Sequence, residues 1–120
     1  MHDLEKAMAS AASGMRAQSL RMRLVAENVA NADTPGFRRK LVSFEQARDA
    51  ATGTTTVRPD RVTLSPAGLR EVYEPGHPLA DDRGVVTFSN VNTLIEMADA
   101  REAHRSYEAG LTAFDQARRM

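Results

Sequence analysis

Residues 4–29 read LEKAMASAASGMRAQSLRMRLVAENV, and small or apolar residues recur in them at alternating steps of four and three. The recurring positions are Leu4, Met8, Ala11, Met15, Gln18, Met22, Val25 and Val29, of which only Gln18 is polar. This is the spacing of a heptad seam, which places its members on one face of a helix. Asp3 is a suitable N-cap. The pattern therefore predicts a helix from about Asp3 to Val29.

A second, weaker seam lies at the other end of the chain. Thr93 and Glu96 have the spacing of a capping box, in which each side chain satisfies a free backbone N–H group at the start of a helix. Behind them, the positions three and four residues apart are Met97, Ala100, His104, Tyr107, Leu111, Phe114 and Arg118. The pattern predicts a second helix from near Asn92 to the last residue.

The two predicted helices are similar in length, about 40 Å each at the helical rise per residue. Because residues 32–91 separate them, they can pair antiparallel with both chain ends at one end of the pair. We therefore expect a mainly α fold: a coiled-coil-like antiparallel pair of long N- and C-terminal helices with a small irregular β-containing middle segment. A pair only two helices thick leaves outward apolar side chains partly exposed, which usually marks an interface. These are Leu20, Leu24, Leu94 and Ile95.

The first helix is expected to end in an elbow. Asn31 can take the left-handed position after the helix, and Pro35 then prevents the helix from continuing. Pro35-Gly36 suits the two central positions of a type II turn, and Phe37 can fold back on the helix end. The elbow residues are Asn28, Asn31, Pro35, Gly36 and Phe37.

The middle segment is expected to be loosely built. Residues 37–44 look extended, and residues 52–56, TGTTT, have nothing to bury and predict a mobile loop. Between residues 57 and 88, four prolines and three glycines exclude a helix.

One small hairpin is predicted inside that segment. The turn sequence Asp81-Asp82-Arg83-Gly84 separates two short β-leaning pieces, residues 69–73 and 85–88. We therefore divide the chain into an N-terminal helix, an elbow, loop and hairpin segment, and a C-terminal helix. Their ranges are 1–31, 32–91 and 92–120.

Composition excludes several classes of protein. A chain of 120 residues is enough for one domain, and the absence of cysteine excludes disulfides, thiolate metal sites and a cysteine nucleophile. Sixteen basic and sixteen acidic residues give a net charge of zero, unlike that of a general nucleic-acid binder. The first six residues lack the pattern of a secretory signal, and no stretch approaches the roughly 18 apolar residues of a membrane span. We expect neither classical secretion nor membrane anchorage.

No set of residues predicts an enzyme, a metal site or a cofactor. The three histidines are scattered: His2, His77 and His104. None of them has a second histidine at the spacing of a zinc hydrolase, and the oxygen ligands of Asn28, Asn31 and Asp33 lack the regular spacing of a calcium loop. Because no nucleophile, base and orienting group can be named together, we expect a protein without catalytic activity, metal or cofactor.

Several motifs resemble those of a known family. Ala12-Ser13-Gly14-Met15 resembles the small-residue step of the family's N-terminal helix. Asn28-Val29-Ala30-Asn31, followed by Thr34-Pro35-Gly36-Phe37-Arg38, resembles the signature that ends this helix, and Arg105-Ser106-Tyr107-Glu108-Ala109 is similar to the C-terminal helix motif. The family is that of the bacterial flagellar axial (rod and hook) proteins, and the resemblance spans nearly the whole chain.

The middle of the chain carries the most specific part of the resemblance. Residues 73–81, YEPGHPLAD, then residues 84–86, 90–92 and 96–97, resemble the segment that separates the proximal-rod members from their rod relatives. The residues singled out in this family segment are Tyr73, Glu74, Pro75, Gly76, Pro78, Leu79, Asn90 and Asn92.

The resemblance implies a structural subunit of the basal-body proximal rod, exported unfolded by the flagellar type III apparatus and assembled in the periplasm into a tubular drive shaft. The implied partners are copies of itself, other rod proteins and the export apparatus, with no nucleic acid and no direct membrane insertion. In the family, the paired terminal helices build the innermost layer. The expected assembly seam is Leu4, Met8, Ala11, Met15, Met22, Val25, Val29, Met97, Ala100, Tyr107, Leu111 and Phe114.

Two other interpretations stay open from the residues alone. A small coiled-coil adaptor unrelated to flagella would have the same seams but would form a closed dimer. The basic run Arg38-Arg39-Lys40 between Phe37 and Phe44 could track phosphates, although such a run on a neutral chain is usually a solvated strand face. Within the first helix, Gly14 costs about 1 kcal/mol relative to alanine and predicts the close approach of a neighbouring helix.

Overall fold

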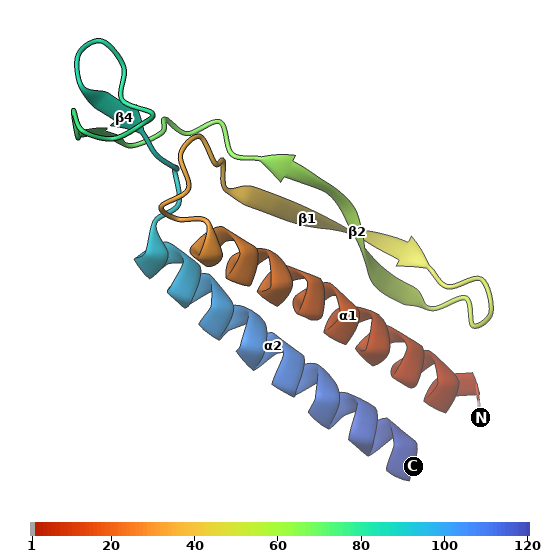
Figure 1. The fold of residues 1–120 in the computed structure, drawn as a ribbon. Helices are drawn as coiled ribbons and strands as arrows, with labels where there is room; N and C mark the ends of the chain where they lie inside the picture. Colours follow the sequence, from red (N-terminus) through yellow and green to blue (C-terminus); the bar gives the residue numbers. More distant parts are fainter. Residues whose placement is uncertain (1) are drawn as a thin grey trace.

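The computed structural model describes the backbone of residues 2–120 and the side chains from Asp3 onward; Met1 and the side chain of His2, part of the expected first segment, lie outside the described residues. Two long helices, α1 (His2–Ala30) and α2 (Thr93–Arg119), run antiparallel along a molecule 67 Å long. The start of α1 and the end of α2 lie at the same end of the pair (Figure 1). The predicted fold class, a mainly α protein built on two paired terminal helices, is confirmed.

Four strands between the helices form two separate hairpins. The long hairpin pairs β1 (Lys40–Arg48) with β2 (Thr55–Leu64), and the short hairpin pairs β3 (Glu71–Tyr73) with β4 (Val85–Thr87). Both are antiparallel. The long hairpin lies along α1 on the side away from α2, whereas the short one projects past the end of the helix pair (Figure 1). The predicted short hairpin is therefore present.

The long hairpin is a correction to the sequence-based expectation. Thr55 and Thr56 belong to β2, so the prediction of a loop over residues 52–56 is wrong there. Nearly every position of β2 is exposed, and the strand therefore lacks the alternation that identifies a half-buried strand. It also contains Pro59, which lies at a shift in the pairing register, where a proline without an N–H group is tolerated.

Asp49 organises the turn of the long hairpin. Its carboxylate accepts hydrogen bonds from the N–H groups of Ala51, at 2.8 Å, and Thr52, at 2.9 Å. These bonds hold the pKa of Asp49 below its ordinary value, with the bond from Thr52 as the main cause. Gly53 completes the turn with a φ of +71°, which an L side chain rarely adopts. A compact turn, closed by one carboxylate, thus joins β1 to β2.

Helix α1 packs on two sides. Ser13, Ala17 and Leu24 are buried and line grooves shared with the long hairpin. The opposite side of the helix, which includes Met15, faces α2. The expectation that Leu20 and Leu24 stay outward and partly exposed is therefore wrong for Leu24, which is buried beside β1. Leu24 was expected to face outward because the long hairpin that covers it was not predicted from the sequence.

At several positions of α2, the residue that packs on α1 is the one directly before the predicted seam residue. Ala103 and Ala117 are buried, whereas their predicted neighbours on the seam, His104 and Arg118, are exposed. At Gly110, an added Cβ would lie 2.9 Å from the Met15 Cγ. Small residues thus let the two helices approach closely. This close packing, and not the burial of the larger side chains in the predicted seam, decides which face of α2 meets α1.

The start of α2 also differs from the prediction. Asn92 is the N-cap: its backbone is extended, and its side-chain oxygen accepts a hydrogen bond from the N–H of Leu94 at 3.0 Å. The predicted capping box of Thr93 and Glu96 does not form, because the Glu96 side chain is fully buried between the helices and β1. The half-buried Arg39 guanidinium and the buried Asn28 amide compete successfully with the helix start for that carboxylate.

Candidate assembly site

A buried polar cluster joins both helices to the start of β1. The Glu96 carboxylate is fully buried, where it pairs with the Arg39 guanidinium and lies 3.4 Å from the side-chain amide nitrogen of Asn28. A buried carboxylate needs such partners, because an unpaired charge away from water is strongly disfavoured. In the described residues, every buried side-chain nitrogen and oxygen atom has a hydrogen-bond partner.

The side-chain amide of Asn28 pairs with the backbone at the start of β1. Its side-chain oxygen accepts a hydrogen bond from the N–H of Lys40 at 2.9 Å, and its amide nitrogen donates to the carbonyl oxygen of Lys40 at 3.0 Å. The amide therefore satisfies both backbone groups of the first residue of β1, as a neighbouring strand would. This pair of bonds sets where the long hairpin leaves the helix.

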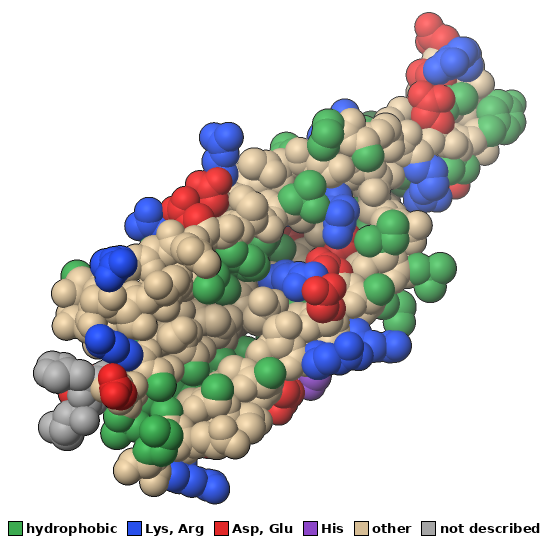
Figure 2. All heavy atoms as spheres, turned by 180° about the vertical axis from the view of Figure 1, so that it is seen from behind, with side chains coloured by type: hydrophobic (Ala, Val, Ile, Leu, Met, Phe, Trp, Pro, Cys, Tyr) green, Lys and Arg blue, Asp and Glu red, His purple; other side chains and the backbone are tan. Residues whose placement is uncertain are grey.

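A second group of charges extends the cluster along the helices. Arg21 of α1 pairs with Asp99 of α2 and lies 3.2 Å from Glu102. The hydrogen bond to Asp99 raises the pKa of Arg21. Beside these charges, a groove of about 500 Å³ runs between β1 and the helices; hydrophobic and charged side chains line the hollow on this face (Figure 2).

The elbow after α1 is a compact turn. The N–H of Phe37 donates to the carbonyl oxygen of Thr34 at 3.2 Å, and Gly36 has a φ of +77°, so Pro35-Gly36 occupies the centre of a type II turn as predicted. Asn31 is not left-handed, because only glycines have positive φ among the described residues. Its side-chain amide instead donates to the Glu27 carbonyl oxygen at 2.9 Å and covers the helix end.

The chain returns to α2 through the same region. The Asn90 oxygen accepts a hydrogen bond from the N–H of Arg39 at 2.6 Å, and its amide nitrogen donates to the carbonyl oxygens of Ser65 and Ala67. Asn90 thus ties three separate segments together, those before β1, after β2 and before α2. Of the family segment, Asn90 and Asn92 therefore lie in the junction, where one ties segments and the other begins a helix.

The other members of the family segment lie in the projecting hairpin. We call residues 71–84 the tip. Gly84 has a φ of +76°, and an added Cβ there would lie 2.9 Å from the Tyr73 ring and 3.0 Å from the Pro75 Cβ, so only glycine fits. Asp81 accepts hydrogen bonds from the N–H groups of Val85 and Arg83, which hold its pKa below its ordinary value.

The basic run before and at the start of β1 is used within the subunit. Arg38 donates to the carbonyl oxygens of Ser65 and Ala67 at 3.2 Å, Arg39 pairs with Glu96, and Lys40 pairs with Glu27. The expectation of a simple solvated strand face is therefore incomplete: each of the three cations has a specific partner inside the subunit. This leaves no argument for a phosphate-binding role.

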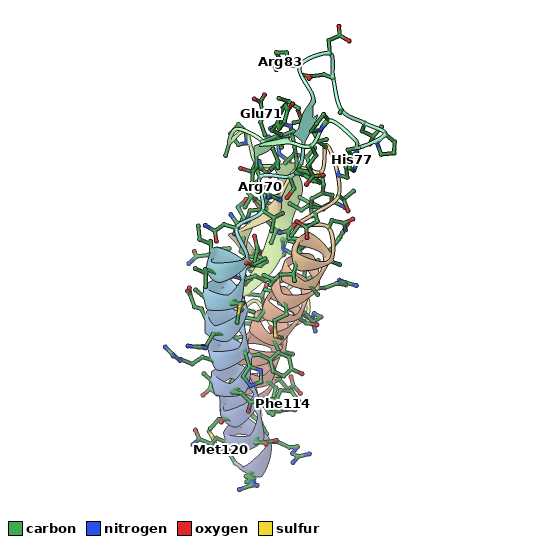
Figure 3. The ribbon with its side chains drawn as sticks, turned by 60° about the vertical axis from the view of Figure 1, so that its left-hand side comes forward. Arg70, Glu71, His77, Arg83, Phe114 and Met120 are labelled. Carbon is green, nitrogen blue, oxygen red and sulfur yellow. The ribbon has the colours of Figure 1, made fainter. Side chains whose placement is uncertain are left out.

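The residues of the predicted assembly seam divide into two groups. Most of the α1 members and Ala100, Tyr107 and Phe114 of α2 are buried or half-buried between the helices; Figure 3 shows Phe114 near the end opposite the tip. The remainder are exposed: Val29, Met97 and Leu111. His104, expected as a polar residue within the seam, is exposed and lies 3.8 Å from Glu108.

Sequence reasoning missed the buried polar cluster. Glu96 was predicted only as a capping residue, and the other possibility, a buried group, was not considered. A signal for the second was present, since Glu96, Ala103, Gly110 and Ala117 recur every seven residues. A charged residue such as Glu96 in a row of small residues predicts a polar partner on the element that packs against it.

The described residues hold no group of three or more acidic or histidine side chains arranged to hold a metal ion. No helix among them is both long enough and apolar enough to cross a membrane.

Comparison with known proteins decides the family. The sequence profile described as "Flagella basal body rod protein" matches residues 8–38. The flagellar basal-body rod protein FlgC of Agrobacterium fabrum is 44% identical over 98% of this chain and 90% of its own length, and that of Aquifex aeolicus is 37% identical over 95% and 89%. The chain belongs to the FlgC family of flagellar basal-body rod proteins. The FlgC of Salmonella typhimurium, 39% identical over 92% of this chain, agrees with this assignment.

Membership of the FlgC family makes the chain a structural component of the flagellar basal-body rod and not an enzyme. The resemblance drawn from the motifs of the sequence is confirmed. Nothing in the structure or in these comparisons supports a coiled-coil adaptor unrelated to flagella.

Proposed function

We propose that this FlgC family member is a proximal-rod subunit, exported by the flagellar type III apparatus and polymerised in the periplasm with copies of itself and other rod proteins. The observation that carries the proposal is the one-sided packing of α2. Apart from Arg39, which contacts Glu96 and Asp99 near the start of α2, that helix packs on α1 alone, while Leu94, Ile95 and Met97 on its surface are more than half exposed. An exposed apolar face of this kind marks a surface that another chain covers.

The assembly seam is proposed to work in two ways. Its inner members hold the two helices of one subunit together, and its exposed members, Val29, Met97 and Leu111, contact neighbouring subunits. Gly14 belongs with the second group: no atom lies within 4 Å of an added Cβ there, so a helix that approaches closely at this point must come from another subunit. Packed helix pairs would then transmit torque along the rod.

The elbow is proposed to set the angle between the helix pair and the outer segment. Asn28, Gly36 and Asn90 make hydrogen bonds that join α1, β1 and the short hairpin at one place. With the elbow held in this way, the proposed segments 1–31 and 92–120 form the inner layer, and residues 32–91 lie outside it and fill the space between neighbours. Phe37 remains a proposed part of the elbow.

A deletion strain tests the proposed function. Cells without the gene should be non-motile and should contain basal bodies arrested before the rod, and the wild-type gene supplied on a plasmid should restore both. Motile deletion cells with complete rods would reject the proposal. Export is tested separately: in cells with an inactive flagellar export apparatus, the chain should remain in the cytoplasm, and its appearance in the periplasm there would reject that part.

A further inference from the structure

The tip presents apolar and acidic side chains to solvent. Tyr73 is 70% exposed and Leu79 is 64% exposed. Beside them, the carboxylates of Glu71, Glu74 and Asp82 are exposed and have no cation within 4 Å among the described residues. The labelled tip residues Glu71, His77 and Arg83 lie at the extreme end of the molecule, far from Met120 (Figure 3). The tip therefore carries an apolar surface edged by unpaired negative charge.

The tip is held in one shape before any partner arrives. Gly84 packs against Tyr73 and Pro75, and the Asp81 carboxylate closes the turn with two backbone N–H groups. The His77 ring lies edge-on to the Phe88 ring, with 6.0 Å between ring centroids. A rigid surface loses little conformational entropy on binding, so its exposed side chains are well suited to docking.

The outer face of α2 has the opposite charge. We define it by Leu94, Met97, Ala98, Arg101 and Arg105, whose spacing places them on one side of a helix. This side is opposite to the one that packs on α1. Leu94 is 77% exposed and Met97 is 58% exposed, and both arginines are exposed. In the described residues, neither arginine has a carboxylate within 4 Å.

The two surfaces match each other. Apart from Met120 at the chain end, Leu94, Tyr73 and Leu79 are the most exposed large apolar side chains in the described part of the chain. All three lie on one surface or the other. Each surface thus combines an uncovered apolar patch with unpaired charge, negative on the tip and positive on the outer face of α2. Complementary charge of this kind sets the orientation of two docking surfaces.

We propose that the tip of one subunit docks on the outer face of α2 of a second copy of this chain. Leu79 and Tyr73 would cover Leu94 and Met97, and the tip carboxylates would meet the two arginines. Because the two surfaces are different, the contact is heterologous and each copy leaves one of each surface open, so it extends a polymer instead of closing a dimer. This inference rests on the proposed function and names one of its contacts.

Disulfide crosslinking tests the contact cleanly, because the chain has no cysteine of its own. A chain that carries both Leu79→Cys and Leu94→Cys should form dimers and a ladder of higher multimers when isolated basal bodies are oxidised, whereas either substitution alone should leave monomers. The matched control is Leu79→Cys with Thr112→Cys. Thr112 is exposed on the same side of α2, about 27 Å beyond Leu94 at the helical rise, and should give no ladder.

Three results would overturn the docking proposal. The first is a double variant that stays monomeric in assembled basal bodies. The second is a double variant that crosslinks no more than the Thr112 control. The third is a Leu79→Cys chain that crosslinks to itself or to a different rod protein, which would make the occupant something other than the α2 face of a second copy.

Charge reversal tests the orientation. In the crosslinking chain, Glu74→Lys with Asp82→Lys should reduce the dimer band several-fold, and so should Arg101→Glu with Arg105→Glu. All four substitutions together should restore it. Arg61→Glu, at an exposed position of β2, is the control and should have no effect. A fourfold variant that crosslinks no better than either pair would reject the proposed orientation.

The two proposals fail in different ways. If the deletion strain is non-motile but assembled rods show no crosslink, the docking contact is wrong and the rod function stands. If the deletion strain is motile, the rod function is wrong. In that case, oxidation of the purified double variant still shows whether the tip binds the outer face of α2.

Discussion

The two helices of this protein have similar lengths but different positions in the fold. Helix α1 is covered on one side by α2 and on the other by the long hairpin: Met15 is half-buried against α2, and Ala17 is buried beside the hairpin. Helix α2 packs on α1 and, at its start, on the Arg39 side chain, and its buried residues are Glu96, Ala103 and Ala117. Helix α1 is thus the centre of the subunit, and α2 is its boundary.

The difference between the helices lies in the kind of side chain that each one buries. The buried side of α2 is small or charged, with Gly110 and alanines close to α1 and Glu96 paired with Arg39. These contacts specify one position for the helix while burying little apolar surface. Tyr107 and Phe114 of α2 are half-buried against α1, whereas Leu94, Ile95 and Met97 are exposed on its surface.

Removal of the buried charge that holds α2 on α1 should destabilise the chain most. Glu96→Ala leaves the Arg39 guanidinium and the Asn28 amide without their carboxylate, and we expect a loss of about 3 kcal/mol in the free energy of unfolding. Urea unfolding followed by circular dichroism measures the loss. The control is Glu108→Ala, at an exposed position on the same helix. Equal effects at the two positions would show that the buried cluster does not hold α2.

The two glycines within the helices give the next test. Gly110→Leu places a side chain against Met15 and the Ala11 carbonyl, and we expect overpacking to destabilise the chain by about 2 kcal/mol. Gly14→Leu meets open space, so the better helix propensity of leucine should stabilise the chain by up to about 1 kcal/mol. Thermal unfolding of both variants measures these effects. The same sign at both positions would contradict the close approach of α2 to α1 at Gly110.

The contact of α1 with the long hairpin is tested by one hydroxyl. Ser13 Oγ accepts a hydrogen bond from the N–H of Val57 at 3.0 Å and donates to the Ser10 carbonyl oxygen. Ser13→Ala should cost about 1 kcal/mol, because the N–H of Val57 then loses its partner. Ser19→Ala, at an exposed position on the same helix, should be neutral by comparison. If amide exchange at Val57 is unchanged in the Ser13 variant, the hairpin is held to α1 in another way.

The smallest effect concerns the turn between β1 and β2. The pKa of Asp49 is lowered by its bonds to backbone N–H groups, so its contribution is present above the ordinary pKa of the carboxyl and is lost as the pH falls through the lowered value. Acidification should therefore shift the amide signals of Ala51 and Thr52 in NMR spectra without unfolding the helices. In Asp49→Asn this shift should be absent. Its persistence there would assign the transition to another group.

Sequence reasoning was most accurate where periodic pattern and local chemistry agree. The helix from about Asp3 to Val29, the type II turn at Pro35-Gly36 and the short hairpin closed by Asp81 each follow from spacing or from one turn residue, and each is present. It failed at β2, where nearly every position is exposed and no alternation of buried and exposed residues marks the strand. It also failed at Glu96, whose role depends on residues distant in the sequence.

The amino-acid sequence alone determined two terminal helices, their antiparallel pairing and the membership of a flagellar family, because repeated spacing and local motifs need no knowledge of distant contacts. Tertiary packing selects the face of α2 that meets α1, places the hairpin of β1 and β2 over α1, and buries Glu96 with Arg39 and Asn28. These features depend on how closely two backbones approach and on which charge finds which partner. The residues spaced seven apart from Glu96 to Ala117 fit both a capped surface helix and a buried seam. The close approach of α1 selects the buried seam.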